Sequence, residues 1–405
     1  MNNNSIILLT KDAFCTEYLP CYGNEYWKGQ TPNIDELINK GTIFTHFYTA
    51  APSSAMAYLA MFTGLYPYEQ NVKEYIPLVE YEGETLFDKA RKRGLECHVI
   101  WDEKWMTTSY VHSMCYGKET IIHPLKGLKQ GVGFHYEFDG PIQASKEKEE
   151  WTLEMIENEI ESITKRGDVF LWFHLPHVIN GRVGYGSDID VFDRVVGIVR
   201  KYFCDSKIFL SGDHGNMNGH RGKLGYGFDV TEPAIHIPLI TPRKAGQAKF
   251  EGLICNIDWD KIIFEGDTIP SREIIISDSA YYAQPNRKTA ILYKNYRYIY
   301  NRIDGSEELY DIEWDPNQNF NLISDNTYDI DRHVEIRSRE LYFYPYWDQL
   351  PDIRAFLREK RKSIWREPTK KQVFVSRIRK NRLVRKLAMP IIKLLRKKRQ
   401  TKNAF

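Results

Sequence analysis

Residues 207–215 read KIFLSGDHG, an apolar run that ends abruptly at Asp213 and His214. Such a run predicts a buried strand, and an acid and an imidazole at its carboxyl end are typical of a metal site. A second run, IILLTKD at 6–12, ends on Asp12. Parallel sheets gather the carboxyl ends of their strands into one crevice. We therefore expect the three side chains to hold one cation, although an Asp in this place can also cap a turn.

A third segment, TAAPSSAMAYLAMFTGLYP at 49–67, combines small hydroxyl residues with a stretch rich in Ala, Leu and Met. Gly64 and Pro67 close it, so the segment predicts a loop that enters a helix whose free amides face the serines. A serine in that place can cap the helix or attack a bound ester.

Short apolar strands alternate with helical stretches along the chain. Examples are a helix at 85–93 before a strand at 96–101, and a helix at 188–202 before a strand at 208–210. With 405 residues and 42% hydrophobic content, the chain can also bury a large core. The pattern predicts a mainly parallel α/β/α sandwich.

Taken in order, the segments from Ile6 to about Leu322 resemble the sulfatases of the alkaline phosphatase superfamily. The segments that carry the resemblance are IILLTKD at 6–12, TPNIDEL at 31–37, GTIFT at 41–45, the AP to GLYP block at 51–67, FLWFHLPH at 170–177, DRVVG at 193–197, SGDHG at 211–215, EPAIHIPLI at 232–240, YRYI at 296–299 and ELYD at 308–311. The resemblance implies an alkaline-phosphatase-like α/β/α sandwich with a mainly parallel central sheet and a small C-terminal α+β part. We expect a catalytic domain at 1–245, strands at 246–325 that complete the same fold, and an extension at 326–405.

The resemblance assigns metal ligands and a nucleophile. Asp12, Asp213 and His214 match the family's metal ligands, and Ser54 stands at the position of its nucleophile, where it would also contact the metal. Ser53 is the alternative nucleophile. A cation held by carboxylates and imidazole polarises an ester oxygen and lowers the pKa of a bound hydroxyl, which suits ester cleavage.

Four further positions match substrate-binding places of the family less closely. His177 is expected to assist the leaving group. Arg221, Lys104 and Tyr226 are candidates for binding the substrate anion. Each can also be an ordinary solvated or packed side chain.

Departures from the family pattern shift the expected chemistry. Met56 and Tyr58 occupy the Pro and Arg places that mark the nucleophile for oxidation to formylglycine, so we expect an unmodified serine and favour a phosphate ester. His214 stands where an Asn is common, and Ala13 where a second Asp often follows. Imidazole favours manganese or zinc over calcium, although calcium is possible, and the ligand set predicts one divalent ion.

The sequence therefore predicts a metal-dependent hydrolase or phosphotransferase that acts on a phosphate or sulfate ester of a small molecule or glycan, in surface-glycan or lipid-linked precursor metabolism. Both a phosphate ester and a sulfate ester are compatible with the sequence, and so are both hydrolysis and transfer. The alternative is a catalytically silent relative that acts as a scaffold or binding protein at the membrane.

Charge is divided unevenly. Residues 354–405 hold 20 Lys or Arg and two acids, a net of +18, which leaves −16 for residues 1–353 because the whole chain carries +2. Within this tail, LVRKLAMPIIKLL at 383–395 mixes apolar residues with cations and predicts contact with an anionic membrane. Nucleic-acid binding is not expected, because no aromatic residues alternate with these cations.

The start of the chain lacks a basic region and a long apolar core, so no signal peptide is expected. No run approaches transmembrane length. We expect a cytoplasmic protein that lies peripherally on the inner membrane face. Its six cysteines would then remain thiols.

Overall fold

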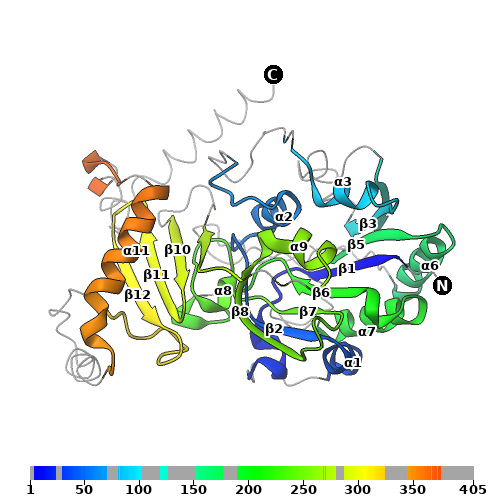
Figure 1. Cartoon of the computed structure of the whole chain (residues 1–405), viewed down its shortest axis with the longest axis horizontal. Helices are drawn as coiled ribbons and strands as arrows, with labels where there is room; N and C mark the ends of the chain where they lie inside the picture. The colour runs from blue at the N-terminus through cyan, green and yellow to red at the C-terminus, as the bar shows by residue number, and fades with distance from the viewer. Residues whose placement is uncertain are drawn as a thin grey trace, which may run out of the picture.

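The computed structural model describes residues 4–23, 30–70, 81, 83–102, 119–125, 152–176, 189–223, 225–267, 269, 271–279, 287–323, 344–365, 367–371 and 373–374. Two sheets dominate this part of the chain, one of eight strands and one of four. Figure 1 shows the large sheet between two groups of helices, with the small sheet at one side of it.

The large sheet is parallel apart from one strand. In spatial order its strands are β4 (Ile121–Leu125), β3 (Glu96–Asp102), β5 (Val169–Leu175), β1 (Ile6–Lys11), β6 (Ile208–Gly212), β7 (Leu239–Thr241), β2 (Thr42–Tyr48) and β8 (Lys249–Cys255). Only β7 runs antiparallel to its neighbours β6 and β2. The central strand β1 lies between β5 and β6, so its carboxyl end lies in the middle of the sheet edge.

Helices cover both faces of the large sheet, which explains why its central strands β5, β1 and β6 are buried almost throughout. Leu8 of β1 faces a core formed with α2 (Ser54–Thr63), α3 (Leu86–Arg91) and α9 (Trp259–Phe264). Ile7 and Leu9 face the opposite core, formed with α1 (Pro32–Lys40), α6 (Leu153–Thr164) and α7 (Ile189–Tyr202). The two helix groups appear on opposite sides of the sheet in Figure 1.

The small sheet is antiparallel, and its spatial order is β12 (Glu307–Asp311), β11 (Tyr296–Asn301), β10 (Lys288–Tyr293) and β9 (Ile274–Asp278). The long helix α11 (Leu350–Ile364) runs alongside it (Figure 1) and buries Leu357 in its core. The short helix α8 (Glu232–Ile235) adds Ala234 and Ile235 to the same core. Several 3-10 turns complete the described elements: Thr16–Tyr18, Pro20–Tyr22, Asp205–Lys207, His220–Gly222, Asn256–Asp258 and Trp347–Gln349.

This architecture confirms the predicted α/β fold with a mainly parallel central sheet and a small C-terminal part. Strand β8 shows that residues after 246 complete the large sheet. The domain boundaries at 245 and 325 stay a prediction. Within the described part of the chain, no helix is both long enough and apolar enough to cross a bilayer.

The start of the C-terminal basic segment packs against the small sheet. Arg354 and Arg358 of α11 both pair with Glu307 of β12, and Arg361 pairs with Glu367. Three cations of this segment are therefore engaged by two carboxylates within the fold. The basic segment predicted to contact a membrane, 383–395, lies outside the described residues.

His98 of β3 has a fully buried ring that contacts Glu96 (2.8 Å) and His123 (2.9 Å). Burial, and then the neighbouring His123, lower the pKa of His98 to about 4. In the unfolded chain the pKa is about 6.5, so the unfolded state binds this proton first as the pH falls. We expect His98 to reduce the free energy of unfolding by up to about 3 kcal/mol between pH 6.5 and 4. The free energy of unfolding, measured in urea at several pH values, should fall less steeply with decreasing pH in His98→Asn than in wild type.

His220 provides a control of opposite sign. Its contact with Glu17 raises its pKa, so its stabilising effect is present below pH of about 6.5 and is lost as the pH rises through the folded-state pKa. His220→Asn should therefore lose more stability at acidic pH than at alkaline pH. Identical pH profiles for wild type and His98→Asn would contradict this account.

Candidate active site

The carboxyl ends of β1 and β6 bring two acids together. Lys11 of β1 is in register with Gly212 of β6, so the residues that follow, Asp12 and Asp213, leave the sheet side by side. Gly212 allows the chain that follows β1 to pass close to the end of β6, because a Cβ at Gly212 would collide with the carbonyl oxygen of Phe14. The site is therefore set by neighbouring parallel strands and by one close backbone approach.

Asp12, Asp213 and His214 form one compact group. His214 Nε2 lies 3.4 Å from Asp12 Oδ1 and 3.5 Å from Asp213 Oδ2. All three residues are at most 2% exposed, and one potential ligand atom from each lies within 4.8 Å of the others. The structure thus brings together the three side chains that the sequence predicted as metal ligands.

Hydrogen bonds to both carboxylate oxygens fix Asp213. Its Oδ1 accepts from the backbone N–H of Ala13 (3.0 Å) and of His214 (2.8 Å), and its Oδ2 accepts from Tyr58 Oη (3.0 Å). Burial alone would raise the pKa of Asp213, but His214 and His174 outweigh it and hold the pKa below its usual range. Asp213 is thereby held as a carboxylate, the form that binds a cation.

The His214 ring is oriented by the backbone. Its Nδ1 lies 2.8 Å from the carbonyl oxygen of Gly215, an acceptor that assigns the ring proton to Nδ1. The lone pair of Nε2 is then directed toward Asp12, Asp213 and Ser54. Metal-binding histidines are commonly oriented in this way by an acceptor on the other ring nitrogen.

Ser54 is the serine whose hydroxyl lies in the site. It is the first residue of α2, and its Oγ lies 3.0 Å from His214 Nε2. Ser53 is the N-cap residue in extended conformation, and its buried Oγ has no hydrogen-bond partner among the described residues. Of the two serines, Ser54 is therefore the one that lies beside the ligand group.

The donor set fits a divalent cation. Two carboxylates and one imidazole converge in a buried space, and buried carboxylates repel each other unless positive charge lies nearby. The buried Lys11 ammonium donates to the main-chain oxygen of Asp12 (3.1 Å), so it supplies one positive charge but no ligand atom. Mixed oxygen and imidazole ligands suit manganese or zinc, and the identity of the ion stays a prediction.

Tyr58 and His174 belong to the surroundings of the site, and neither was predicted as a site residue. Tyr58 lies one turn after Ser54 in α2, on the same helix face. Besides its bond to Asp213, its hydroxyl lies 2.9 Å and 2.8 Å from the two ring nitrogens of His174. The four-residue spacing from Ser54 is the signal that could have identified Tyr58.

The remaining predicted substrate residues separate into two groups. The Tyr226 ring packs against the His214 ring, with centroids 4.3 Å apart. Arg221 instead pairs with Glu308 at 2.9 Å and lies near the face of the Tyr310 ring. Tyr226 therefore contacts the predicted metal site directly, whereas Arg221 is tied to the small sheet.

His177 and Lys104 lie outside the described residues. His177 follows β5, which ends next to β1 in the large sheet. Lys104 follows β3, the next strand along. Their roles in substrate binding stay predictions.

A family model described as Sulfatase matches residues 4–207, which is half of the chain and includes Asp12 and Ser54. The chain has the fold of the alkaline phosphatase superfamily, a superfamily that includes hydrolases of sulfate and phosphate esters. Within that superfamily the chain belongs to the sulfatase family. The resemblance stated from the sequence is thereby confirmed.

A curated N-acetylgalactosamine-6-O-sulfatase from Bacteroides thetaiotaomicron is 27% identical over 139 residues, which cover 33% of this chain. The match spans only 26% of that relative. Among solved structures, BT4656 in complex with D-glucosamine-2-N,6-O-disulfate gives a TM-score of 0.60 at 16% identity, over 85% of this chain and 97% of that one. A phosphonate monoester hydrolase of Agrobacterium radiobacter gives a TM-score of 0.58 at 14% identity, over 87% of this chain and 96% of that one. At these identities the two structures show a shared fold.

Tyr58→Phe tests how the site is supported. The change removes the hydroxyl that donates to Asp213 but keeps the ring in the core. We expect manganese or zinc to bind about tenfold or more weakly, because outer hydrogen bonds orient ligand carboxylates. Isothermal titration calorimetry measures this affinity. Tyr300→Phe, which removes a hydroxyl bound to Glu367 instead, is the matched control; equal affinities in the two variants would contradict the assignment.

Proposed function

We propose that this protein is a metal-dependent enzyme that cleaves or transfers a phosphate or sulfate ester through Ser54. One observation carries the proposal: Ser54 Oγ lies 3.0 Å from His214 Nε2, inside the buried group formed with Asp12 and Asp213. A hydroxyl, two carboxylates and an imidazole in one place are the parts that covalent ester cleavage needs. Membership of the sulfatase family supports the reaction class.

Asp12, Asp213, His214 and Ser54 would hold the metal ion. A divalent cation in that place lowers the pKa of a hydroxyl and neutralises charge on the ester oxygens. The lone pair of His214 Nε2 can serve either the Ser54 hydrogen or a cation, but not both at once. We therefore assign this nitrogen to the cation in the active protein.

In the proposed reaction, the Ser54 hydroxyl gives its proton to solvent and Oγ attacks the phosphorus or sulfur atom. A bond from Oγ to that atom forms as the bond to the leaving alcohol oxygen breaks. His177 donates a proton to the leaving oxygen. Water or an acceptor hydroxyl then attacks the phosphorus or sulfur atom and gives its proton to His177, while the bond to Oγ breaks and Oγ takes a proton from solvent. Ser54 is restored, and phosphate, sulfate or the transferred product is released.

A phosphate ester is the favoured substrate. The Arg that accompanies formylglycine formation is replaced by Tyr58, whose hydroxyl is instead bonded to Asp213. Met56, in the place of the Pro, is fully buried in the core. An unmodified serine suits attack on phosphorus, whereas formylglycine suits sulfate esters. The two similar structures span both chemistries in their names, a disulfated glucosamine and a phosphonate monoester.

We place the substrate among phosphorylated or sulfated small molecules and glycans, including lipid-linked precursors. The N-acetylgalactosamine-6-O-sulfatase, and BT4656 with its disulfated glucosamine substrate, support a glycan because both concern sulfated amino sugars. The choice between hydrolysis and transfer depends on how well the complete pocket excludes water. The cytoplasmic location on the inner membrane face stays part of this proposal.

A second candidate is a catalytically silent scaffold of a membrane glycan pathway. The replaced Pro and Arg after Ser54 favour it. The buried ligand group opposes it, because a silent protein has no need to hold two carboxylates and an imidazole together. Absence of bound metal, with no loss of stability on chelation, would favour the scaffold.

Ser54→Ala tests the proposed nucleophile. Phosphomonoesters, phosphodiesters and sulfate esters are screened with manganese, zinc or calcium, and the best pair is used for kinetics. We expect Ser54→Ala to lose at least about a thousandfold in kcat, because no other described hydroxyl lies beside His214 Nε2.

Ser53→Ala is the control for this experiment, since it removes a neighbouring hydroxyl that makes no contact with the ligand group. Its kcat should stay within about threefold of wild type. If Ser54→Ala keeps its activity, the nucleophile is Ser53 or a water molecule, and the assignment is wrong.

The membrane proposal is tested with a chain that ends at Phe374. This end point keeps α11 and its ion pairs with Glu307, and it removes the basic residues from 375 onward. Full-length protein should float with anionic liposomes and the shortened protein should not, because each cation near such a surface contributes on the order of 1 kcal/mol. Equal flotation of both proteins would rule out the tail as the membrane contact.

A further inference from the structure

The chain between β6 and α8 forms a loop that begins at His214 of the predicted metal site. We call residues 214–223 and 225–229 the His214 loop. It contains Tyr226, which packs on the His214 ring. Asn218 and Arg221 adopt the left-handed backbone conformation, with φ of 48° and 55°. Asn tolerates this conformation, and Asn218 is bonded to Tyr18 and Glu17. For Arg221 it costs about 1–2 kcal/mol, so contacts to Arg221 are needed to hold it in this conformation.

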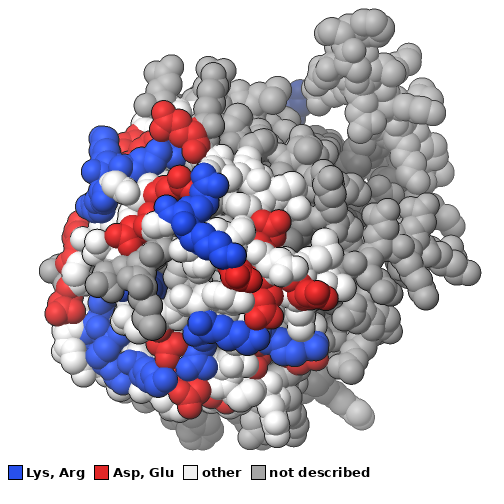
Figure 2. Space-filling model, turned by 90° about the vertical axis from the view of Figure 1, so that its right-hand side faces the viewer, with Lys and Arg blue, Asp and Glu red and all other residues white. Residues whose placement is uncertain are grey.

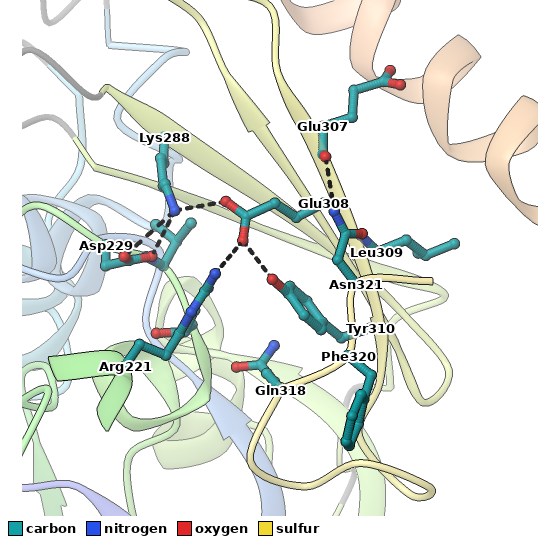
Figure 3. Close-up of polar contacts among 12 residues, drawn as sticks. Arg221, Asp229, Lys288, Glu307, Glu308, Leu309, Tyr310, Gln318, Phe320 and Asn321 are labelled. Atoms are coloured by element: carbon teal, nitrogen blue, oxygen red, sulfur yellow. Dashed lines mark hydrogen bonds and ion pairs between the residues drawn. The ribbon is translucent and has the colours of Figure 1, made fainter. Parts of the chain in front are cut away.

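Glu308 of β12 is the centre of the contacts that reach Arg221 from the small sheet (Figure 3). Its Oε1 accepts from Lys288 Nζ at 2.7 Å. Its Oε2 accepts from Arg221 Nη2 at 2.9 Å and from Tyr310 Oη at 2.6 Å. One carboxylate of the small sheet thus binds a strained residue of the loop directly.

Two more contacts join the small sheet to the loop. Lys288 Nζ lies 3.5 Å from each carboxylate oxygen of Asp229, which also pairs with Lys223 inside the loop. Ser279 Oγ donates to the carbonyl oxygen of Gly227 at 2.9 Å. The loop is therefore held on both sides of its tyrosine.

The charge of Glu308 is essential to this arrangement. Its burial alone would raise its pKa, but Lys288 and Arg221 outweigh this and lower the pKa to about 2. Glutamine has the same shape but cannot balance two cations. In Glu308→Gln, Arg221 would lose its carboxylate partner, and a partly buried charge without such a partner is costly, whereas Lys288 would keep its contact with Asp229.

We propose that Glu308 is a positioning residue for the active site: through Arg221 and Lys288 it fixes the His214 loop, and thereby the tyrosine that packs on the His214 ring. The inference rests on the proposed function for its effect on catalysis. Its structural part does not, because the position of the loop can be measured without a substrate.

The test compares Glu308→Gln with Glu307→Gln, a matched control at the adjacent residue. Glu307 faces α11 and pairs with Arg354 and Arg358 (Figure 3 shows the two glutamates directed apart). Hydrogen exchange measured by mass spectrometry should show faster exchange of the loop in Glu308→Gln, including the amides of Met217 and Gly219 that are bonded within the loop. In Glu307→Gln the faster exchange should appear in α11 instead.

Kinetics and metal titration then measure the effect on the site. We expect Glu308→Gln to lose about tenfold or more in kcat and in manganese affinity, with a smaller change in KM. The double variant with Glu308→Gln and Arg221→Gln should lose little more kcat and manganese affinity than either single variant, since the two residues act as a unit. If wild type cleaves no ester, the proposed function fails and the exchange data still decide the role of Glu308. Loop exchange equal in the two glutamine variants would overturn the inference.

Discussion

Two carboxylates buried side by side at the end of a parallel sheet are the constraint on which the rest of this structure depends. Asp12 and Asp213 reach this position because β1 and β6 are neighbours in register and because Gly212 admits the chain that follows β1. Such a pair is unfavourable without compensating charge. His214, held by the carbonyl of Gly215, completes an arrangement that is stable and useful when a divalent cation is present.

The small sheet has a role beyond completing the core. Glu232 of α8 forms a buried ion pair with Arg297 of β11 (3.1 Å) and accepts a hydrogen bond from Tyr48 of β2 (2.7 Å), so α8 links the two sheets. The His214 loop enters α8 directly. The small sheet therefore contacts this part of the chain at two places, at α8 and at Glu308.

The sequence predicted the parts of this protein that depend on local pattern. Apolar runs ending in acids predicted β1 and β6 and indicated that Asp12 and Asp213 meet at one edge of the sheet, because strand direction and strand ends are visible in the residue order. Other features depend on pairs far apart in the chain, such as Arg221 with Glu308. No periodicity indicates such a pair, so Arg221 was expected at the substrate rather than at the small sheet. Tyr58 was noted only as a missing arginine, because its bond to Asp213 exists only in the folded chain.

Anomalous diffraction from crystals grown with manganese tests the central claim most directly. The account predicts one strong anomalous peak among Asp12 Oδ1, Asp213 Oδ2 and His214 Nε2, with Ser54 Oγ beside it. The absence of a peak in that place, in crystals that show the carboxylates ordered as described, would contradict the metal site and with it the proposed chemistry.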